Sequence, residues 1–170
     1  MTASTGYLLD SHVLLWWWFD PQRMPEGVLA LLSDEETPVV ISSASVWELS
    51  IKHHQGKLPE LRHAITDLTA LLRADGFQIL SIAISHALHA GAYSQLHRDP
   101  FDRMLAAQAE LEQLVLVTPI RNLRPSLAAG FGRVDQRACC ADQGSTVSAR
   151  VASRRSAVNN TAASRRARAR

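Results

Sequence analysis

Two aspartates lie at the predicted start of a helix in residues 97–109, which read HRDPFDRMLAAQA. Proline favours the first helical position because its missing N–H has no partner there, so Pro100 predicts the helix start and Asp99 its N-cap. Asp102 then falls at the third helical position, where a negative charge suits the helix dipole. The apolar run at residues 104–109 predicts that the helix packs on a core and holds both acids at its rim. The two carboxylates either cap the helix or converge on a metal ion.

A third acid, Asp10, follows the apolar residues 7–9. The chain from Gly6 to Leu9 predicts a short buried strand, with Ser11 as the N-cap of the next helix. Ligands of open parallel sheets bind outside the carboxyl ends of the strands, so an acid at this position suits chemistry. The alternative is that Asp10 itself caps the helix.

A fourth acid, Glu48, lies early in a predicted helix among the apolar neighbours of residues 45–52, SVWELSIK. Burying a carboxylate without a partner is costly, so Glu48 must be neutralised, paired with a cation or bound to a metal. Lys52 lies one helical turn further along and could form that ion pair. The sequence leaves both the ion pair and the metal site open.

Apolar runs and turn signals alternate along the chain in a pattern typical of an α/β protein. Strands are expected at residues 6–9, 39–41, 77–82 and 115–117. Helices are expected at residues 12–19, 25–32, 44–57, 61–72, 85–93 and 100–114. This alternation predicts a three-layer α/β/α fold with a mostly parallel central sheet.

Net charge divides the chain into two parts. The formal net charge of +2 hides nine arginines and two aspartates in residues 132–170, whereas residues 1–131 carry a net charge of −5. We expect residues 1–131 to form one domain and the Arg-, Ala- and Ser-rich residues 132–170 to be a disordered tail, because the tail cannot bury a core. The tail is either inert or a cationic arm that binds RNA nonspecifically. The acidic domain would meet phosphates only through local arginines or metal ions.

Other features exclude several classes of protein. Asp10 and His12 interrupt the first apolar stretch, which argues against a signal peptide, and no apolar run reaches the roughly 20 residues that a membrane span needs. We therefore expect a soluble cytoplasmic protein without membrane contact. The two cysteines, Cys139 and Cys140, are adjacent and form no zinc framework.

Tryptophans and histidines that stand out in the sequence have structural explanations. Three consecutive tryptophans at residues 16–18 cannot share one buried helical stripe, because consecutive helical residues point about 100° apart. At least one of them is expected to face a partner or a groove. The rings either belong to the core and a subunit interface or stack on an unpaired base. His86 and His89 are expected at the solvent or the core edge rather than as metal ligands, because no acid stands near them in the sequence.

Taken together, these stretches resemble the PIN-domain family, in particular the VapC-type ribonuclease toxins of bacterial toxin–antitoxin pairs. The matching segments are YLLDSH at residues 7–12, SVWELSIK at 45–52, GKL at 56–58, the stretch at 97–109 and VLVT at 115–118. The resemblance covers about residues 6–120 and rests on the ordered set of segments. It implies the family's α/β/α fold and metal-dependent hydrolysis of RNA.

The resemblance also implies roles for the four acids. Asp10 matches the family's first metal ligand, Glu48 its second acid and Asp102 the acid that opens its central helix. Asp99 accompanies Asp102 in one subgroup, but capping explains it better. Asp10, Asp102 and Glu48 would bind Mg²⁺, or Mn²⁺ in its place, and all four acids would be catalytic. The implied partners are an RNA substrate, a cognate antitoxin and a second copy of the chain in a homodimer.

The chain departs from the family pattern near its last strand. Ile120 stands where the family carries its last acid, and the final strand is missing or altered downstream of it. A catalytically inactive PIN-like binding module is therefore the alternative to a nuclease. A phosphotransfer protein with Asp10 as nucleophile is a second alternative, although such a protein would have a second Asp where this chain has His12. Arg98 and Arg103 are candidates for phosphate contacts, and the alternative for each is an ion pair with a neighbouring acid.

Overall fold

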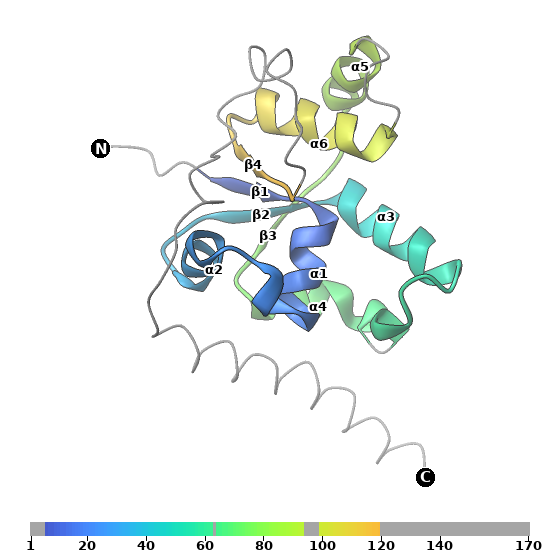
Figure 1. The fold of residues 1–170 in the computed structure, drawn as a ribbon. Coiled ribbons are helices and arrows are strands. Elements are labelled where there is room, and N and C mark those ends of the chain that lie inside the picture. The colour runs from blue at the N-terminus through green and yellow to red at the C-terminus, as the bar shows by residue number, and fades with distance from the viewer. Residues whose placement is uncertain (1–5, 63, 94–98, 120–170) are drawn as a thin grey trace.

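Four short parallel strands form the central sheet of the computed structural model, which describes residues 6–62, 64–93 and 99–119 (Figure 1). The strands are β1 (Tyr7–Leu9), β2 (Val39–Ser42), β3 (Gln78–Leu80) and β4 (Val115–Val117), in the spatial order β3-β2-β1-β4. Tyr7 of β1 lies opposite Val39 of β2 and Val115 of β4. Because all the pairings are parallel, the carboxyl ends of these strands meet at one edge of the sheet.

Helices cover both faces of this sheet. Within the described ranges they are α1 (Ser11–Phe19), α2 (Glu26–Ser33), α3 (Ser43–His54), α4 (Leu68–Ala74), α5 (Ile84–Ala92) and α6 (Pro100–Leu111). Figure 1 shows α5 and α6 on one side of the sheet and α1, α2 and α4 on the other. Helix α3 contacts both α1 and α6, so it links the two helical layers. The expected three-layer α/β/α fold with a parallel sheet is confirmed.

Alternate side chains of the strands enter two separate apolar cores. Leu9 and Ile41 pack in the larger core, which α1, α2 and α4 complete. Leu8 and Val40 pack with Leu105 of α6 on the opposite face. Successive strand residues point to opposite faces, and a sheet covered on both sides needs apolar residues at every position. Strands β1 and β4 and residues 39–41 of β2 therefore read as short continuous apolar runs, whereas β3 is largely exposed and begins with Gln78.

Three helices are followed by a residue in the left-handed backbone conformation. Gly56 after α3 and Gly76 after α4 have φ angles of 72° and 77°, a region that favours glycine because it has no Cβ. Gln113 after α6 has a φ of 55°, and the N–H of Leu114 donates to the carbonyl of Ala109 at 2.8 Å. These turns end α3 and α6 three residues before the ends predicted from the sequence.

The helix expected over residues 61–72 forms only in its second half. Two 3-10 turns come first, at Pro59–Arg62 and Ile65–Asp67, and α4 begins at Leu68. The N–H of Ala64 donates to the carbonyl of Leu61 at 3.0 Å, and both side chains are buried. Side chains three residues apart are eclipsed in a 3-10 helix, so this geometry lets both residues reach the core.

Helix α1 buries two of its three consecutive tryptophans. Trp17 and Trp18 are buried, and both donate their ring N–H to the Asp75 carboxylate, at 3.2 and 2.8 Å. Trp16 stays partly exposed, with the guanidinium of Arg23 5.6 Å from its ring centroid. The three rings do not share one buried stripe, as their spacing predicts. The expectation that one of them faces a partner stays a prediction.

Two histidines of α5 fasten this helix to the C-terminal half of α6 and its C-cap. His86 Nε2 lies 2.9 Å from Oε1 of Glu112, and His89 Nε2 lies 2.7 Å from Oε2 of Glu110. The hydroxyl of Tyr93 donates to the same Glu110 oxygen at 2.7 Å. Hydrogen bonds from His89 and Tyr93 hold the pKa of Glu110 below its ordinary value. A position at the solvent or the core edge is wrong for His86, which is buried because a carboxylate at the end of α6 supplies a partner.

Several expectations concern residues that the structure does not describe. Those expectations concern the boundary at residue 131, the tail at residues 132–170, Cys139 and Cys140, Arg98, Ile120 and the final strand, all outside residues 6–62, 64–93 and 99–119. They stay predictions. Within the described ranges, no helix combines the length and apolar character needed to cross a membrane.

The backbone at Gln113 predicts the effect of a glycine there. Gln113→Gly should raise the free energy of unfolding by about 0.5–1 kcal/mol, because glycine adopts a positive φ without steric cost. Urea unfolding measures the difference. The matched control is Gln55→Gly at the C-cap of α3, where φ is −76° and glycine should give no gain. An equal gain at both positions would contradict the assignment of strain to Gln113.

Candidate functional site

The carboxylate of Asp10 ties the end of β1 to the start of α1 and the end of β4. Its Oδ1 accepts the backbone N–H of His12 at 2.9 Å, and its Oδ2 accepts the hydroxyl of Thr118 at 2.9 Å. Asp10 is therefore the N-cap of α1, and the expectation that Ser11 caps this helix is wrong. Burial raises the pKa of Asp10, but the hydrogen bonds with His12 and Thr118 outweigh it and lower the pKa overall.

The hydroxyl of Ser11 lies between the carboxylates of Asp10 and Glu48. It donates to Glu48 Oε2 at 2.5 Å and lies 3.3 Å from Asp10 Oδ1. The other Glu48 oxygen, Oε1, lies 2.6 Å from Nζ of Lys52, so the predicted ion pair is confirmed. No sequence signal indicates the bridging role of Ser11, because a serine at a helix start does not reveal a partner 37 residues away.

Asp102 joins this group from the first turn of α6, where it is half-buried. Burial raises the pKa of Asp102 to about 6, together with the negative charges of Asp99, Asp10 and Glu48. These charges affect Asp102 because the carboxylates lie near one another. The structure therefore brings the four candidate acids into one electrostatic environment at the carboxyl edge of the sheet.

Asp99 is the N-cap of α6, as its position before proline predicts. Its Oδ1 accepts the backbone N–H of Phe101 at 2.8 Å, and its side chain is exposed. Capping leaves its negative charge in place, and that charge contributes to the raised pKa of Asp102. Asp99 therefore acts both as a helix cap and as part of the acidic group.

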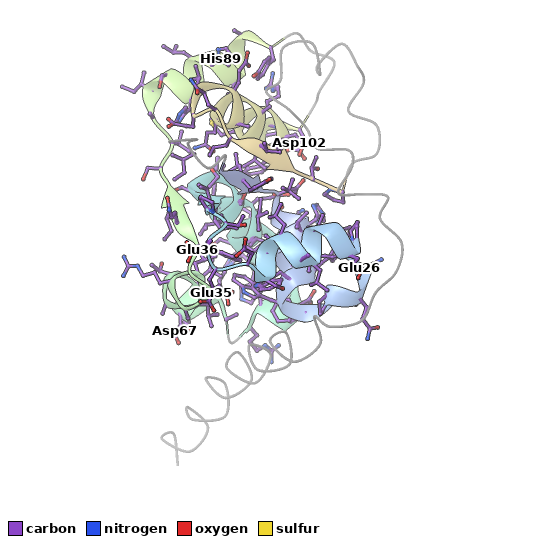
Figure 2. All side chains as sticks on the ribbon, turned by 90° about the vertical axis from the view of Figure 1, so that its left-hand side faces the viewer. Glu26, Glu35, Glu36, Asp67, His89 and Asp102 are labelled. Carbon is purple, nitrogen blue, oxygen red and sulfur yellow. The ribbon has the colours of Figure 1, made fainter. Side chains whose placement is uncertain are left out.

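Other acids of the domain lie away from this group. Figure 2 shows labelled carboxylates around α2 and α4, on the other side of the sheet from α6, at Glu26, Glu35, Glu36 and Asp67. Negative charge is therefore spread over the domain, but the acids whose charges raise the pKa of Asp102 are the other three candidates, Asp99, Asp10 and Glu48.

Few positive charges offset the four carboxylates. Lys52 is paired with Glu48, and His12 Nδ1 lies 3.3 Å from Asp10 Oδ1. The hydrogen bond with Asp10 raises the pKa of His12. Arg103, next to Asp102, has a buried Nε without a hydrogen-bond partner in the part of the chain that the structure describes. The site has an excess of negative charge, which favours the binding of a cation.

The donor set suits a hard divalent cation bound by few protein ligands. Mg²⁺ prefers oxygen ligands and is usually held by one or two carboxylates together with water and substrate phosphate. Among the described residues, no three His, Cys, Asp or Glu side chains form a group that could hold a metal ion. Both oxygens of Glu48 already have partners, in Ser11 and Lys52. Asp10 and Asp102 fit a set of two carboxylates.

A buried hydrogen-bond network fixes the two helices that carry Glu48 and Asp102. The hydroxyl of Ser42 accepts the backbone N–H of Ala44 as the N-cap of α3 and donates to Oε1 of Gln108 in α6 at 2.5 Å. The amide of Gln108 also donates to the carbonyl of Ser81 at 3.3 Å. The sequence places Gln108 inside an apolar run and does not reveal this role. The network joins the start of α3 and the middle of α6 to the sheet.

Residues 7–119 of the chain match the PIN domain family. This match spans the whole parallel sheet and the four candidate acids, Asp10, Glu48, Asp99 and Asp102. A comparison with curated proteins gave no match.

The raised pKa of Asp102 predicts how stability depends on pH. The folded protein binds more protons than the unfolded chain between the ordinary pKa of 3.8 and about 6, so this carboxylate lowers stability as pH rises through that window. At pH 7, Asp102→Asn should raise the free energy of unfolding by about 1 kcal/mol, after allowance for partial exposure, and near pH 4 the gain should disappear. Urea unfolding across pH 4–8 in EDTA, with exposed Glu36→Gln as control, tests this; a pH-independent difference would refute it.

The network around Gln108 gives a second prediction. Gln108→Met keeps the side-chain length but leaves the Ser42 hydroxyl and the Ser81 carbonyl without their partner, which should lower the free energy of unfolding by about 1–3 kcal/mol. The control, Gln78→Met on the exposed strand β3, should change it by less than about 0.5 kcal/mol. Similar losses for the two variants would show that the network contributes little.

Proposed function

The chain belongs to the PIN-domain family, and from this premise we propose that it is a metal-dependent endoribonuclease, the toxin of a toxin–antitoxin pair. PIN domains are generally nucleases, which gives the class of reaction. The single observation that carries the proposal is the grouping of acids around Asp102, whose pKa is raised to about 6 by burial first and then by the charges of Asp99, Asp10 and Glu48. Neighbouring carboxylates disfavour one another's ionisation, and a bound cation would relieve that repulsion, so the grouping supports a metal site.

Asp10 and Asp102 are the residues that would hold Mg²⁺, or Mn²⁺ in its place. When bound, the ion lowers the pKa of a coordinated water and offsets the negative charge of the phosphate. Glu48 and Asp99 would orient water around it. The hydrogen bonds from His12 and Thr118 keep Asp10 ionised, which suits a ligand, and Ser11 and Lys52 fix the orientation of Glu48.

The substrate of this site would be a phosphodiester bond of RNA. Water is the nucleophile in the proposed reaction, so the 2′-hydroxyl need not take part. The resemblance to VapC-type toxins implies products with 5′-phosphate and 3′-hydroxyl ends. Arg103 follows Asp102 directly in α6, and this position makes it, together with Arg98, a candidate for a phosphate contact. Its positive charge would help an acidic surface accept a phosphate.

The proposed partners follow from the resemblance to VapC-type toxins. A cognate antitoxin would cover the acidic site, and a second copy of the chain would form a homodimer. Size-exclusion chromatography with light scattering, at several concentrations of the purified chain, measures the second of these.

Cleavage of RNA tests the proposed activity. The purified full-length chain should cleave RNA in Mg²⁺ and should stop when EDTA is added. Asp10→Asn and Asp102→Asn should each lower the cleavage rate at least about 100-fold, because each removes a charged ligand. Exposed Glu36→Gln, which removes one charge from the other side of the sheet, is the matched control and should retain the rate.

Two outcomes would contradict the nuclease. Cleavage that survives both substitutions would come from another site or from a contaminant. Binding of RNA without cleavage in Mg²⁺ or Mn²⁺ would favour the alternative, a catalytically inactive binding module. Thermal unfolding separates metal binding from catalysis, because Mg²⁺ should raise the melting temperature of the wild type and not that of Asp10→Asn.

A further inference from the structure

Trp47 is unusual among the tryptophans because it is largely exposed. Its side chain is 59% exposed, whereas Trp17 and Trp18 are buried. A large aromatic ring in water loses the stabilisation that burial gives, and its exposed face is free to stack on a planar ligand. Trp47 lies in the middle of α3, directly before Glu48.

Phe101 holds the ring of Trp47 from the neighbouring helix. The two ring centroids are 5.1 Å apart and the ring planes meet at 73°, an edge-to-face arrangement. This contact joins α3 to α6, and Phe101 directly precedes Asp102. We call Trp47 and Phe101 the aromatic pair. Each of its two residues directly precedes a candidate acid in its own helix, Glu48 in α3 and Asp102 in α6.

We propose that the aromatic pair is the surface on which one unpaired base of the substrate stacks while its phosphate lies at the carboxylates. The inference rests on the proposed function, because it names the form of RNA that the same site takes. Aromatic side chains stack on any exposed base, and RNA-binding proteins use them for single strands, loops and bulges. A duplex keeps its bases stacked on one another and offers none to the ring.

The distribution of apolar surface favours a base over a protein partner. A protein interface needs a contiguous apolar core, and single exposed apolar side chains do not make one. The other large exposed apolar side chains in the described part of the chain belong to β3, the connection to α5, α5 and the end of α6: Ile79, Ile82, Ile84, Leu88 and Leu111. None of these five side chains belongs to α3 or to the start of α6. Trp47 is therefore an isolated exposed ring whose aromatic neighbour is Phe101.

Binding of labelled RNA tests the inference without cleavage. Full-length Asp102→Asn, in Mg²⁺, is titrated into a fluorescent 12-nucleotide single strand and into a duplex of the same sequence. Adding Trp47→Ala should weaken binding of the single strand roughly 10-fold and binding of the duplex hardly at all. Trp47→Phe should retain most of the affinity. Leu88→Ala, another exposed apolar residue on α5, is the matched control and should have no effect.

An abasic scan then connects the ring to one nucleotide. A series of single strands is made, each lacking the base at one position. At one position, removing the base should weaken binding by the protein with Trp47 to the level at which Trp47→Ala binds the intact strand. At that position, Trp47→Ala should cause no further loss, because the two changes remove the same contact. Losses that add at every position would overturn the inference, as would unchanged affinity of Trp47→Ala for the single strand.

The failure of this inference can be told apart from the failure of the proposed function. If the wild type cleaves RNA and Trp47→Ala cleaves and binds RNA equally well, the stacking inference is wrong and the proposed nuclease activity stands. If the chain binds single strands through Trp47 but cleaves no RNA, the stacking inference stands and the proposed nuclease activity is wrong. If Trp47→Ala leaves RNA binding intact but abolishes self-association in light scattering, the ring belongs to a protein interface and the inference is wrong.

Discussion

Repulsion between like charges is the constraint on which the site depends. Asp10, Glu48, Asp99 and Asp102 come from three parts of the chain, and nearby carboxylates disfavour one another's ionisation. Hydrogen bonds overcome this at Asp10, whose pKa is lowered despite burial. At Asp102, burial and the neighbouring charges dominate, and the pKa rises. Hydrogen bonds therefore favour the ionised form of Asp10, whereas at Asp102 the charge of His12 offsets burial and the neighbouring acids only in part, so a bound cation would matter most there.

The parallel sheet and one hydrogen-bond network hold these acids in place. Strands β1, β2 and β4 end at the same edge, and Asp10, Ser42 and Thr118 lie at those ends. Ser42 caps α3 and at the same time bonds to Gln108 of α6, so the helices that carry Glu48 and Asp102 share one anchor. Helix starts are mobile unless their N–H groups are satisfied, and this arrangement satisfies α3 while it fixes α6.

Sequence reasoning predicts the features that local pattern determines. The strands, the cap at Asp99 and the ion pair between Glu48 and Lys52 follow from residues within one turn or one strand, and the structure confirms them. It misses contacts between distant residues, because they leave no local pattern. Ser11 bonds across 37 residues and Gln108 across 66, and both are indistinguishable in sequence from ordinary helical residues. The first half of the helix expected at residues 61–72 forms 3-10 turns for the same reason, since packing of the buried Leu61 determines the backbone conformation there.

The order of residues explains why aromatic rings accompany the acids. Consecutive helical residues point about 100° apart, so a helix that turns one side chain into the site presents its neighbour at the rim. Glu48 is 7% exposed while Trp47 before it is 59% exposed. Phe101 precedes Asp102 in the same way on α6, and the two rings meet because α3 and α6 are packed together. Packing that brings two acid-bearing helices together therefore also brings an aromatic pair to the edge of the site.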